Sequence, residues 1–289
     1  MTTEYRVYVP AGYDAKLPSA AMIFLDGNLV LGRDGGRRTL DVLDNLISRK
    51  RIPYMIAIFV NPGRIDASAS NPTSAAVKQV AGRWGRTTDD ALRSVLCDTV
   101  SDRYPHFLAD ELLPAVSAQY NIRKDAYSHA IAGFSSGGNC AFNAAWQLPQ
   151  SFSRVLSGIG SYTSIQWKES PELQEGAQDY PDKVLREEHR NIRVWLQDGS
   201  DDMEQVPFGS WPLGNIRMAN ALKLSDFDFH FSFGSGGHGP EQVEAQLPEV
   251  LTWLWRDYDA AKQEQVFQME ASEKAKPVFR VTISNRDSN

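Results

Sequence analysis

The stretch that decides the fold is Ser128–Trp146, which reads SHAIAGFSSGGNCAFNAAW. It begins with a short apolar run of strand character and continues, from Gly138 onward, as a helix. Between the two lies Gly133–Gly137, a G-x-S-x-G pentapeptide with Ser135 at its centre. In this strand–turn–helix context the serine sits on a sharp turn with its hydroxyl exposed above the sheet. The pentapeptide also arises by chance in simple turns, but its flanks favour a nucleophilic serine.

A serine nucleophile needs a base, and His238 is the histidine best placed to supply one. It lies in a glycine-rich loop after the strand-like run Phe227–Phe233 and before the last long helical pattern. From a loop beyond the last strand, an imidazole can reach across the sheet to the nucleophile. Of the other four histidines, His230 lies inside that run. We interpret these four as structural: His106, His129, His189 and His230.

The acid that orients the histidine is expected between the serine and the histidine, directly after a strand. The segment Ile192–Asp202, IRVWLQDGSDD, meets both conditions and offers Asp198, Asp201 and Asp202. We prefer Asp202, because a turn after the strand would aim it back toward the imidazole. Asp198 is the second choice and would otherwise bond backbone N–H groups of the turn. The resulting order, serine then acid then histidine, is the order expected of an α/β-hydrolase.

Two backbone N–H groups are expected to form an oxyanion hole. The first is that of Ser136, directly after the nucleophile, at the start of the helix. The second is that of Asn28, in the loop after the early strand-like run Ile23–Leu25, where Gly27 permits a close approach. An ordinary Asp-Gly turn is the alternative for this loop.

The rest of the chain repeats the pattern of a short apolar run followed by a longer amphipathic segment. Strand-like runs are Arg6–Val9, Ala21–Leu25, Met55–Val60, His129–Ala132, Arg154–Ile159, Arg193–Leu196 and Asp228–Phe233. Helical periodicity marks Leu40–Ile47, Phe107–Tyr120, Ala141–Leu148, Ile216–Leu224 and Val243–Trp255. This alternation predicts an α/β fold, with a mostly parallel central sheet and helices on both faces.

Two stretches lack clear periodicity, Asn61–Ser101 and Tyr162–Arg190, and we predict irregular loops or caps there. Solvated excursions are the alternative. Aromatic side chains that could line a substrate pocket lie in or near these stretches: Trp84, Trp167, Phe208 and Trp211. Each could equally anchor its own loop. Arg83 and Arg86 flank Trp84, a pattern suited to an anionic aromatic acyl group such as a catecholate.

Composition excludes several classes of protein. The 289 residues include 30 Lys plus Arg and 36 Asp plus Glu, a formal charge of −6, and no basic run, so we expect no nucleic acid partner. No apolar stretch is long enough to cross a bilayer, and the N-terminus lacks the pattern of a signal peptide. Gly234–Gly239 matches the dinucleotide pattern G-x-G-x-x-G, but a terminal helix follows it where a dinucleotide site needs a strand with an acidic residue. The two cysteines lack metal spacing and no other metal or nucleotide motif occurs, so we expect no cofactor and no metal. We expect a cytoplasmic protein, or an exported one if a signal was removed.

Domain organisation follows the same pattern. We predict a catalytic domain over residues 1–259 and a C-terminal tail over residues 260–289. In the tail Phe279, Val281 and Ile283 alternate with polar residues, which predicts one half-buried strand. That strand would add to a sheet edge or to a partner subunit, suggesting a homodimer, or it would remain a loose tail.

The motifs together resemble the putative-esterase family, which includes enterochelin esterases, feruloyl and acetylxylan esterases and the antigen 85 mycolyltransferases. The residues that carry the resemblance are Phe24–Asn28, Asp98–Tyr104, Asp110–Pro114, Gly133–Gly138, Gln197–Asp202 and Gly236–His238. The resemblance is closest to the enterochelin esterase-like group and implies an α/β-hydrolase fold. It implies the triad Ser135, Asp202 and His238, and an oxyanion hole from Asn28 and Ser136. It also implies that Asp26 contacts a substrate hydroxyl, as the equivalent loop does in the mycolyltransferases.

The leading hypothesis is therefore a serine carboxylic-ester hydrolase that works through an acyl-enzyme. The expected partner is a small-molecule ester or lactone of an aromatic or catecholate acid or of a sugar. Acyl transfer to a sugar or polyol, with the same triad, is one alternative. A catalytically silent binding protein is the other, and the intact Ser, Asp and His argue against it.

Overall fold

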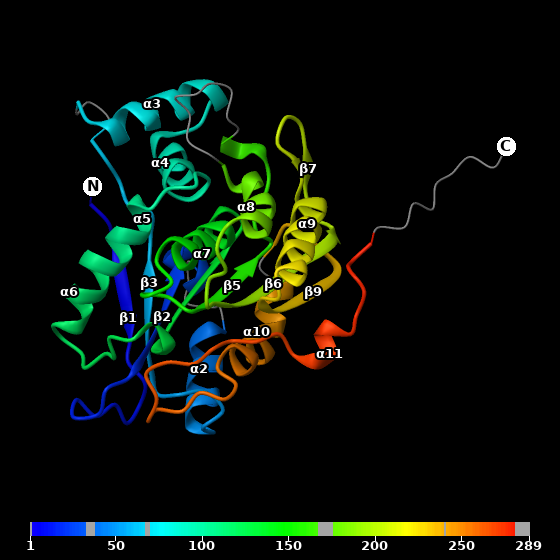
Figure 1. Cartoon of the computed structure of the whole chain (residues 1–289). Helices are drawn as coiled ribbons and strands as arrows, with labels where there is room; N and C mark the ends of the chain where they lie inside the picture. Colours follow the sequence, from blue (N-terminus) through cyan, green and yellow to red (C-terminus); the bar gives the residue numbers. More distant parts are fainter. Residues whose placement is uncertain (1, 33–37, 67–69, 167–175, 240, 281–289) are drawn as a thin grey trace.

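The structure is a computed structural model, and we describe residues 2–32, 38–66, 70–166, 176–239 and 241–280. Its centre is a seven-stranded sheet with the strand order β1-β3-β2-β4-β5-β6-β9 (Figure 1). The strands are β1 (Tyr5–Tyr8), β2 (Ala20–Leu25), β3 (Met55–Val60), β4 (His129–Phe134), β5 (Arg154–Gly158), β6 (Arg193–Asp201) and β9 (Asp228–Gly237). All neighbours pair in parallel except β1, which runs antiparallel to β3 at one edge.

All seven strand-like runs of the sequence are strands of this sheet. β2, β3, β4 and β5 are buried along their whole length, which explains why their apolar residues do not alternate with polar ones. β6 and β9 extend past the predicted ends and remain paired up to Asp201 and Gly237. These extensions carry the chain toward the loops that hold Asp202 and His238.

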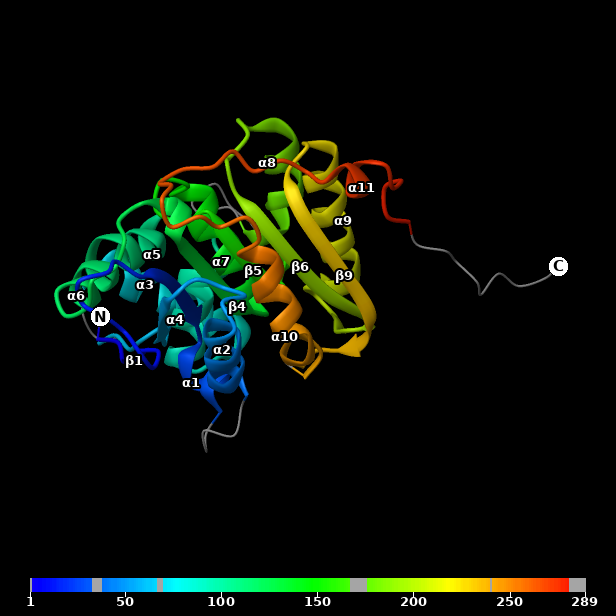
Figure 2. The same cartoon turned by 90° about the horizontal axis from the view of Figure 1, so that it is seen from below.

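Helices cover both faces of the sheet (Figure 2). On one face lie α1 (Gly27–Leu31), α2 (Thr39–Ser48) and α10 (Glu241–Leu254), whose apolar side chains pack with the even-numbered residues of β2. On the other face lie α4 (Thr88–Cys97), α7 (Ser136–Gln147) and α9 (Trp211–Leu224), packed with Ile23 and Leu25. The α/β-hydrolase fold class expected from the sequence is confirmed.

The prediction of irregular structure over Asn61–Ser101 and Tyr162–Arg190 was wrong in part. The first stretch contains α3 (Pro72–Trp84) and α4, and the second contains α8 (Tyr180–Arg186). Asn71 caps α3 through the N–H of Ser74, and Thr87 caps α4 through that of Asp90. Both caps have a recognisable sequence pattern. Asn71 is followed by a proline at the first helical position, and Thr87 is followed three residues later by an acidic residue.

The remaining short elements connect these layers. They are α5 (Arg103–His106), the π-helical turn η1 (Phe107–Leu112), α6 (Leu113–Ser117), η2 (Ala126–Ser128), η3 (Ser164–Gln166), η4 (Ala177–Asp179), β7 (Glu204–Gln205), β8 (Gly209–Ser210) and α11 (Ala271–Lys274). β7 and β8 form a small antiparallel hairpin. Together α5, η1 and α6 make the continuous helical segment expected around Phe107–Tyr120.

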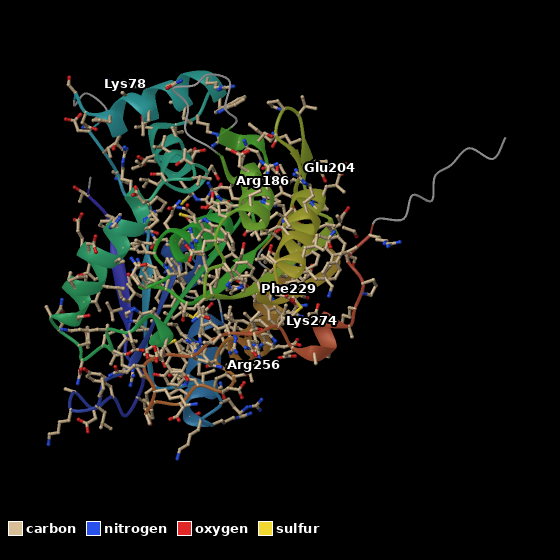
Figure 3. All side chains as sticks on the ribbon, in the orientation of Figure 1. Lys78, Arg186, Glu204, Phe229, Arg256 and Lys274 are labelled. Carbon is tan, nitrogen blue, oxygen red and sulfur yellow. The ribbon has the colours of Figure 1, made fainter. Side chains whose placement is uncertain are left out.

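The chain after α10 runs back along the sheet to β9. Figure 3 labels Arg256 and Lys274 on this segment and Phe229 on β9. Phe279 packs edge-on against Phe229 and Phe231 of β9, and its backbone is hydrogen-bonded to Asn220. The described part of the tail therefore lies against the predicted catalytic domain. Val281 and Ile283 of the predicted strand lie outside the described residues, so the tail strand and the division at residue 259 stay predictions.

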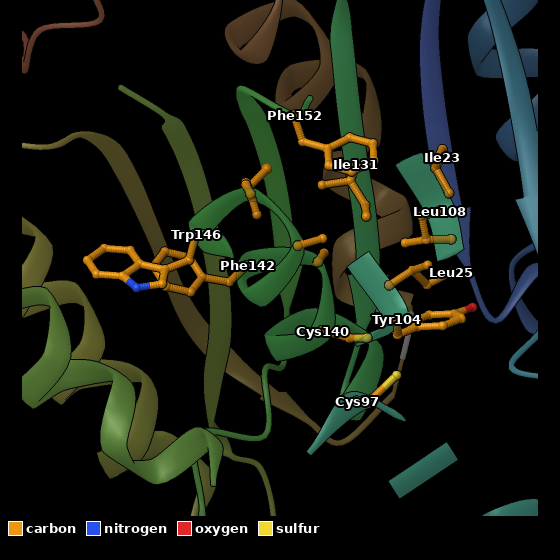
Figure 4. Close-up of a cluster of buried hydrophobic side chains, with 14 of the residues drawn as sticks. Ile23, Leu25, Cys97, Tyr104, Leu108, Ile131, Cys140, Phe142, Trp146 and Phe152 are labelled. Carbon is orange, nitrogen blue, oxygen red and sulfur yellow. The ribbon is translucent and has the colours of Figure 1, made fainter. Parts of the chain in front are cut away.

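The two cysteines lie in the core under the sheet. Cys97 and Cys140 are buried and reduced, beside Tyr104 and Leu108 (Figure 4). Burial raises the pKa of the Cys97 thiol, which keeps it protonated and unreactive. In the described residues, no helix combines the length and the apolar composition that crossing a membrane requires.

Candidate active site

Ser135 occupies a strained turn between β4 and α7. Its backbone has φ 57° and ψ −125°, a conformation that an L-residue rarely adopts. Gly133 and Gly137 approach each other so closely that a Cβ on Gly133 would lie 2.1 Å from the Gly137 carbonyl oxygen. The N–H of Ser135 donates to the Gly158 carbonyl of β5 at 3.0 Å, which fixes the turn to the sheet. The glycines of the pentapeptide are therefore a steric requirement of the turn.

His238 lies between Ser135 and Asp202. Its Nε2 is 2.9 Å from Ser135 Oγ, and its Nδ1 is 2.5 Å from Asp202 Oδ1. Because a carboxylate only accepts, we assign the ring proton to Nδ1, which leaves Nε2 free to accept the Ser135 hydroxyl proton. Residues separated by about a hundred positions thus form one hydrogen-bonded chain at the carboxyl ends of the strands.

Of the three candidate acids, the structure places Asp202 against His238. Burial alone would raise the pKa of this carboxyl, but hydrogen bonds from His238 and Asp198 and from the Met203 N–H lower it below the usual value. Asp202 is therefore ionised at neutral pH. Asp198 is fully buried and accepts from the Gly199 N–H and from Asn215 Nδ2, each at 2.8 Å.

The two predicted oxyanion donors differ in their surroundings. Ser136 is the first residue of α7, so its N–H has no partner within the helix and lies next to the nucleophile. The Asn28 N–H, in contrast, donates to Asn61 Oδ1 at 3.0 Å. The expectation of a free donor at Asn28 is thus not met in this arrangement, because the end of β3 brings the Asn61 side chain against it. No sequence pattern links the two asparagines.

Asp26 is tied to an arginine that the sequence did not single out. Both Asp26 oxygens accept from Arg93 of α4, at 2.8 Å from Nε and 2.7 Å from Nη2. Arg93 also donates to the Phe134 carbonyl, one residue before the nucleophile, at 3.3 Å. A Cβ on Gly137 would lie 2.7 Å from Asp26 Oδ2. The pair therefore supports the turn that carries Ser135. The contact of Asp26 with a substrate hydroxyl, expected from the resemblance, stays a prediction.

A cavity of about 250 Å³ opens over Ser135. The residues that line it are Arg86, Asp90, Arg93, Ser94, Asp98, Ser135, Ser136, Ile165, Met203, Gln205, Phe208 and Trp211. Trp211 is therefore in the pocket wall, as the sequence suggested. Trp84 is in contact with the wall rather than part of it, because its ring packs edge-on against Phe208 at 5.0 Å. Trp167 lies outside the described residues.

Contacts beside this cavity join the end of α3 to the β7–β8 hairpin. Figure 1 shows α3, α4 and the β7–β8 hairpin at the same end of the molecule. The guanidinium of Arg86 lies 5.8 Å from the centre of the Phe208 ring, and that of Arg83 lies 4.6 Å from the Trp84 ring. The hairpin and the end of α3 are thus joined by the edge-on contact of Trp84 with Phe208 and by the Arg86 guanidinium over the Phe208 ring.

Ser161 is a second residue of the site that the sequence did not reveal. It is fully buried, and its Oγ lies 3.3 Å from Ser135 Oγ. Trp211 Nε1 donates to the same Ser161 oxygen at 3.0 Å, and the Trp211 ring packs edge-on against His238 at 5.6 Å. Ser161 follows β5 without any motif, so only the fold brings it to the nucleophile.

In the described residues, no group of three or more His, Cys, Asp or Glu side chains is arranged to hold a metal ion. The site combines a serine, a histidine and a carboxylate at one end of an α/β sheet, with the N-terminus of α7 behind the serine. This fold and this set of residues define the α/β-hydrolase class of serine enzymes.

Comparison with known proteins places the chain within that class. The model of the family described as Putative esterase matches residues 2–254, so the chain belongs to this family and is a carboxylic ester hydrolase. The resemblance noted in the sequence is thereby confirmed.

Solved structures with the same fold include two kinds of esterase. A ferulic acid esterase superposes with a TM-score of 0.63 at 19% identity, covering 89% of this chain and 93% of that one. The enterobactin esterase of Shigella flexneri, solved with 2,3-dihydroxy-N-benzoyl-glycine, gives 0.60 at 21% identity, covering 88% of this chain and 56% of that one. The feruloyl esterase module of Clostridium thermocellum, solved with sinapinate, gives 0.57 at 15% identity, covering 88% and 84%. This chain thus spans only about half the length of the enterobactin esterase.

Proposed function

We propose that the chain hydrolyses carboxylic esters with Ser135 as nucleophile, His238 as general base and Asp202 as the acid that orients the histidine. The observation that carries this proposal is the hydrogen-bonded chain from Asp202 through His238 to Ser135. As Ser135 attacks the ester carbonyl, His238 Nε2 takes the hydroxyl proton and later gives it to the leaving alcohol. Water activated on the same nitrogen then releases the acyl group.

The developing oxyanion needs N–H donors beside Ser135. The Ser136 N–H at the start of α7 is the first, with the positive end of the helix dipole behind it. For the second we propose the Asn28 N–H, which becomes available when the Asn61 side chain turns away from it. An oxyanion is a stronger acceptor than an amide oxygen, so the charge that forms during the reaction would favour this exchange.

The nucleophile is tested by labelling with a fluorophosphonate and mapping the adduct. We expect the label on Ser135, and we expect Ser135→Ala to lose at least roughly 10³-fold of its kcat on p-nitrophenyl acetate. Ser117→Ala, at an exposed serine of α6, is the matched control and should label and turn over normally. An adduct elsewhere, or undiminished turnover by Ser135→Ala, would refute the triad.

For the substrate we propose an ester of an aromatic acid. Phe208 and Trp211 offer ring faces and edges in the cavity above Ser135, and Arg86 offers a cation at its mouth. Two of the structurally similar esterases were solved with aromatic acids or their conjugates, which supports the same acyl class here. A ring bearing acidic or phenolic groups fits an aromatic wall with an adjacent guanidinium.

A panel of esters tests this choice: acetyl, feruloyl, 2,3-dihydroxybenzoyl-serine and an aldonolactone. We expect kcat/KM for the aromatic esters to exceed that for the acetyl ester at least tenfold. The aldonolactone tests the sugar alternative, and adding a polyol acceptor tests acyl transfer by the appearance of a new ester. Equal activity across the panel would remove the aromatic preference and leave the esterase assignment intact.

A further inference from the structure

One oxygen of the Asp202 carboxyl receives no hydrogen bond from the residues of the proposed triad. Oδ1 accepts from His238 Nδ1 and from the Met203 N–H, both at 2.5 Å. Oδ2 is buried, and no donor among the described residues bonds to it. An ionised carboxylate oxygen that is buried without a donor is costly, so a partner is expected.

The group nearest in sequence and chemistry is the carboxyl of Asp198, in β6 and four residues before Asp202. The two carboxyls are close enough for each to shift the pKa of the other. Asp198 itself is fully buried, and its own two oxygens already accept from the Gly199 N–H and from Asn215 Nδ2. Two carboxyls can share a hydrogen bond only if one of them carries a proton.

Among the described residues, no Lys or Arg forms an ion pair with either of these two carboxyls. The groups that act on Asp198 are Asp202, the Gly199 N–H and the Asn215 amide. The cations on the elements packed against β6 are engaged elsewhere. Arg217 of α9 pairs with Asp182, and Lys223 of α9 donates to the Glu273 carbonyl. Arg154 of β5 donates to the Leu254 carbonyl, and α10 carries no Lys, Arg or His. Asp228 of β9 pairs with Arg193 and Arg256. Asp201, the neighbour in sequence, is exposed. Two negative charges would therefore face each other in a buried site with only His238 nearby.

We propose that Asp198 is a protonated positioning residue that donates its hydrogen bond to Asp202 Oδ2 and so holds the ionised Asp202 in register with His238. The proton belongs on Asp198 because Asp202 accepts from His238, whose imidazolium would stabilise an ionised partner, whereas Asp198 accepts only from the neutral Gly199 N–H and Asn215 amide. Burial and the charge of Asp202 raise the pKa of Asp198 to about 9, which agrees with this assignment. The proposal rests on the proposed triad and adds a fourth side chain to it.

Three variants separate a donor role from mere packing. Asp198→Asn keeps a donor of the same shape, and Asp198→Leu fills the space without any hydrogen-bonding atom. We expect kcat to fall by no more than about threefold in Asp198→Asn and by at least tenfold in Asp198→Leu, with KM unchanged in both. Asp201→Asn removes an exposed carboxyl from the same strand, three residues after Asp198, and is the matched control for the loss of charge.

The pH profile gives a readout that packing alone would not change. In the wild type, kcat/KM should fall as the pH rises through about 9, because the ionised Asp198 then repels Asp202. Asp198→Asn should lose this alkaline limb, since its amide cannot ionise, whereas Asp201→Asn should keep it. An identical limb in wild type and Asp198→Asn would overturn the proposal.

Infrared difference spectroscopy tests the proton on the wild-type protein, whatever the variants do to folding. At pH 7 the C=O stretch of a protonated carboxylic acid should be present in the wild type and Asp201→Asn and missing from Asp198→Asn. Absence of that difference would overturn the proposal even if Ser135 takes the fluorophosphonate label. A missing label on Ser135 would instead refute the triad itself, so the two failures are distinguishable.

Discussion

The ion pair between Asp26 and Arg93 offers the sharpest test of how the nucleophile turn is supported. Replacing Arg93 with Met leaves the Asp26 carboxylate without its cation, and Asp26 is only 9% exposed as a side chain. Removing one partner of a buried pair costs about 3–5 kcal/mol. Arg93 retains 27% exposure, so water can replace part of the lost interaction, and we expect about 3 kcal/mol. In a domain of this size that loss lowers Tm by about 5–10 °C.

The double-mutant cycle isolates the pair from other effects of each change. Asp26→Asn and Arg93→Met each leave one charged group unpaired, whereas the combined variant leaves none. We therefore expect the double variant to lose at least about 1 kcal/mol less than the sum of the two single losses. Urea and thermal unfolding measure the stabilities. Arg64→Met, which breaks an exposed ion pair with Asp89, should cost only a small fraction of that loss.

Activity provides the second half of this test. Arg93 also holds the Phe134 carbonyl, so its removal should loosen the Ser135 turn and lower kcat on an activated ester more than it changes KM. Strict additivity of the two single variants would refute the reasoning, because it would mean that the carboxylate and the guanidinium do not stabilise each other. Unchanged kcat in Arg93→Met would refute the link to the nucleophile turn.

Three further outcomes follow from the geometry. Ser161→Ala removes a hydrogen bond to Ser135 Oγ worth about 1 kcal/mol, so kcat should fall about fivefold in steady-state assays, and an equal kcat would contradict it. Phe208→Ala removes a ring that lines the cavity and packs under the Arg86 guanidinium. KM for a feruloyl ester should then rise several-fold, while KM for an acetyl ester should change little. The pKa of Asp198 is about 9 in the native state and about 4 in the unfolded state. The proton on Asp198 therefore stabilises the native state fully below about pH 4, and this stabilisation is lost as the pH rises toward 9. The unfolding free energy of the wild type relative to Asp198→Asn should thus decrease as pH rises from 4 to 9, by at most about 1.4 kcal/mol per unit, and a difference independent of pH would contradict it.

The sheet could be predicted from the sequence because each strand is a short apolar run bounded by turns. Its central strands are buried on both faces, so their composition alone identifies them. The helices α3 and α4 were missed because the surrounding segment is rich in Pro, Gly, Ser and Arg. Their capping residues Asn71 and Thr87 were the available signal.

The residues of the site also fall into those that the sequence predicts and those that it does not. Ser135, Asp202 and His238 could be predicted because each follows a recognisable strand, and the end of a strand fixes where the next loop begins. Arg93 and Asn61 could not, because each acts through a partner far away in sequence: Arg93 on Asp26, and Asn61 on the N–H of Asn28. Such contacts are set by the packing of α4 and β3 against the early loop, and no local pattern encodes them.

The direction of the hydrogen-bonded chain through the site follows from its two ends. The indole N–H of Trp211 can only donate, so Ser161 Oγ accepts from it and can donate its own proton to Ser135 Oγ. In that arrangement Ser135 donates its hydroxyl proton to His238 Nε2, and His238 in turn donates from Nδ1 to Asp202. Trp211 is therefore more than a pocket wall. It reaches the Ser135–His238 pair through Ser161 and through the contact of its own ring with His238.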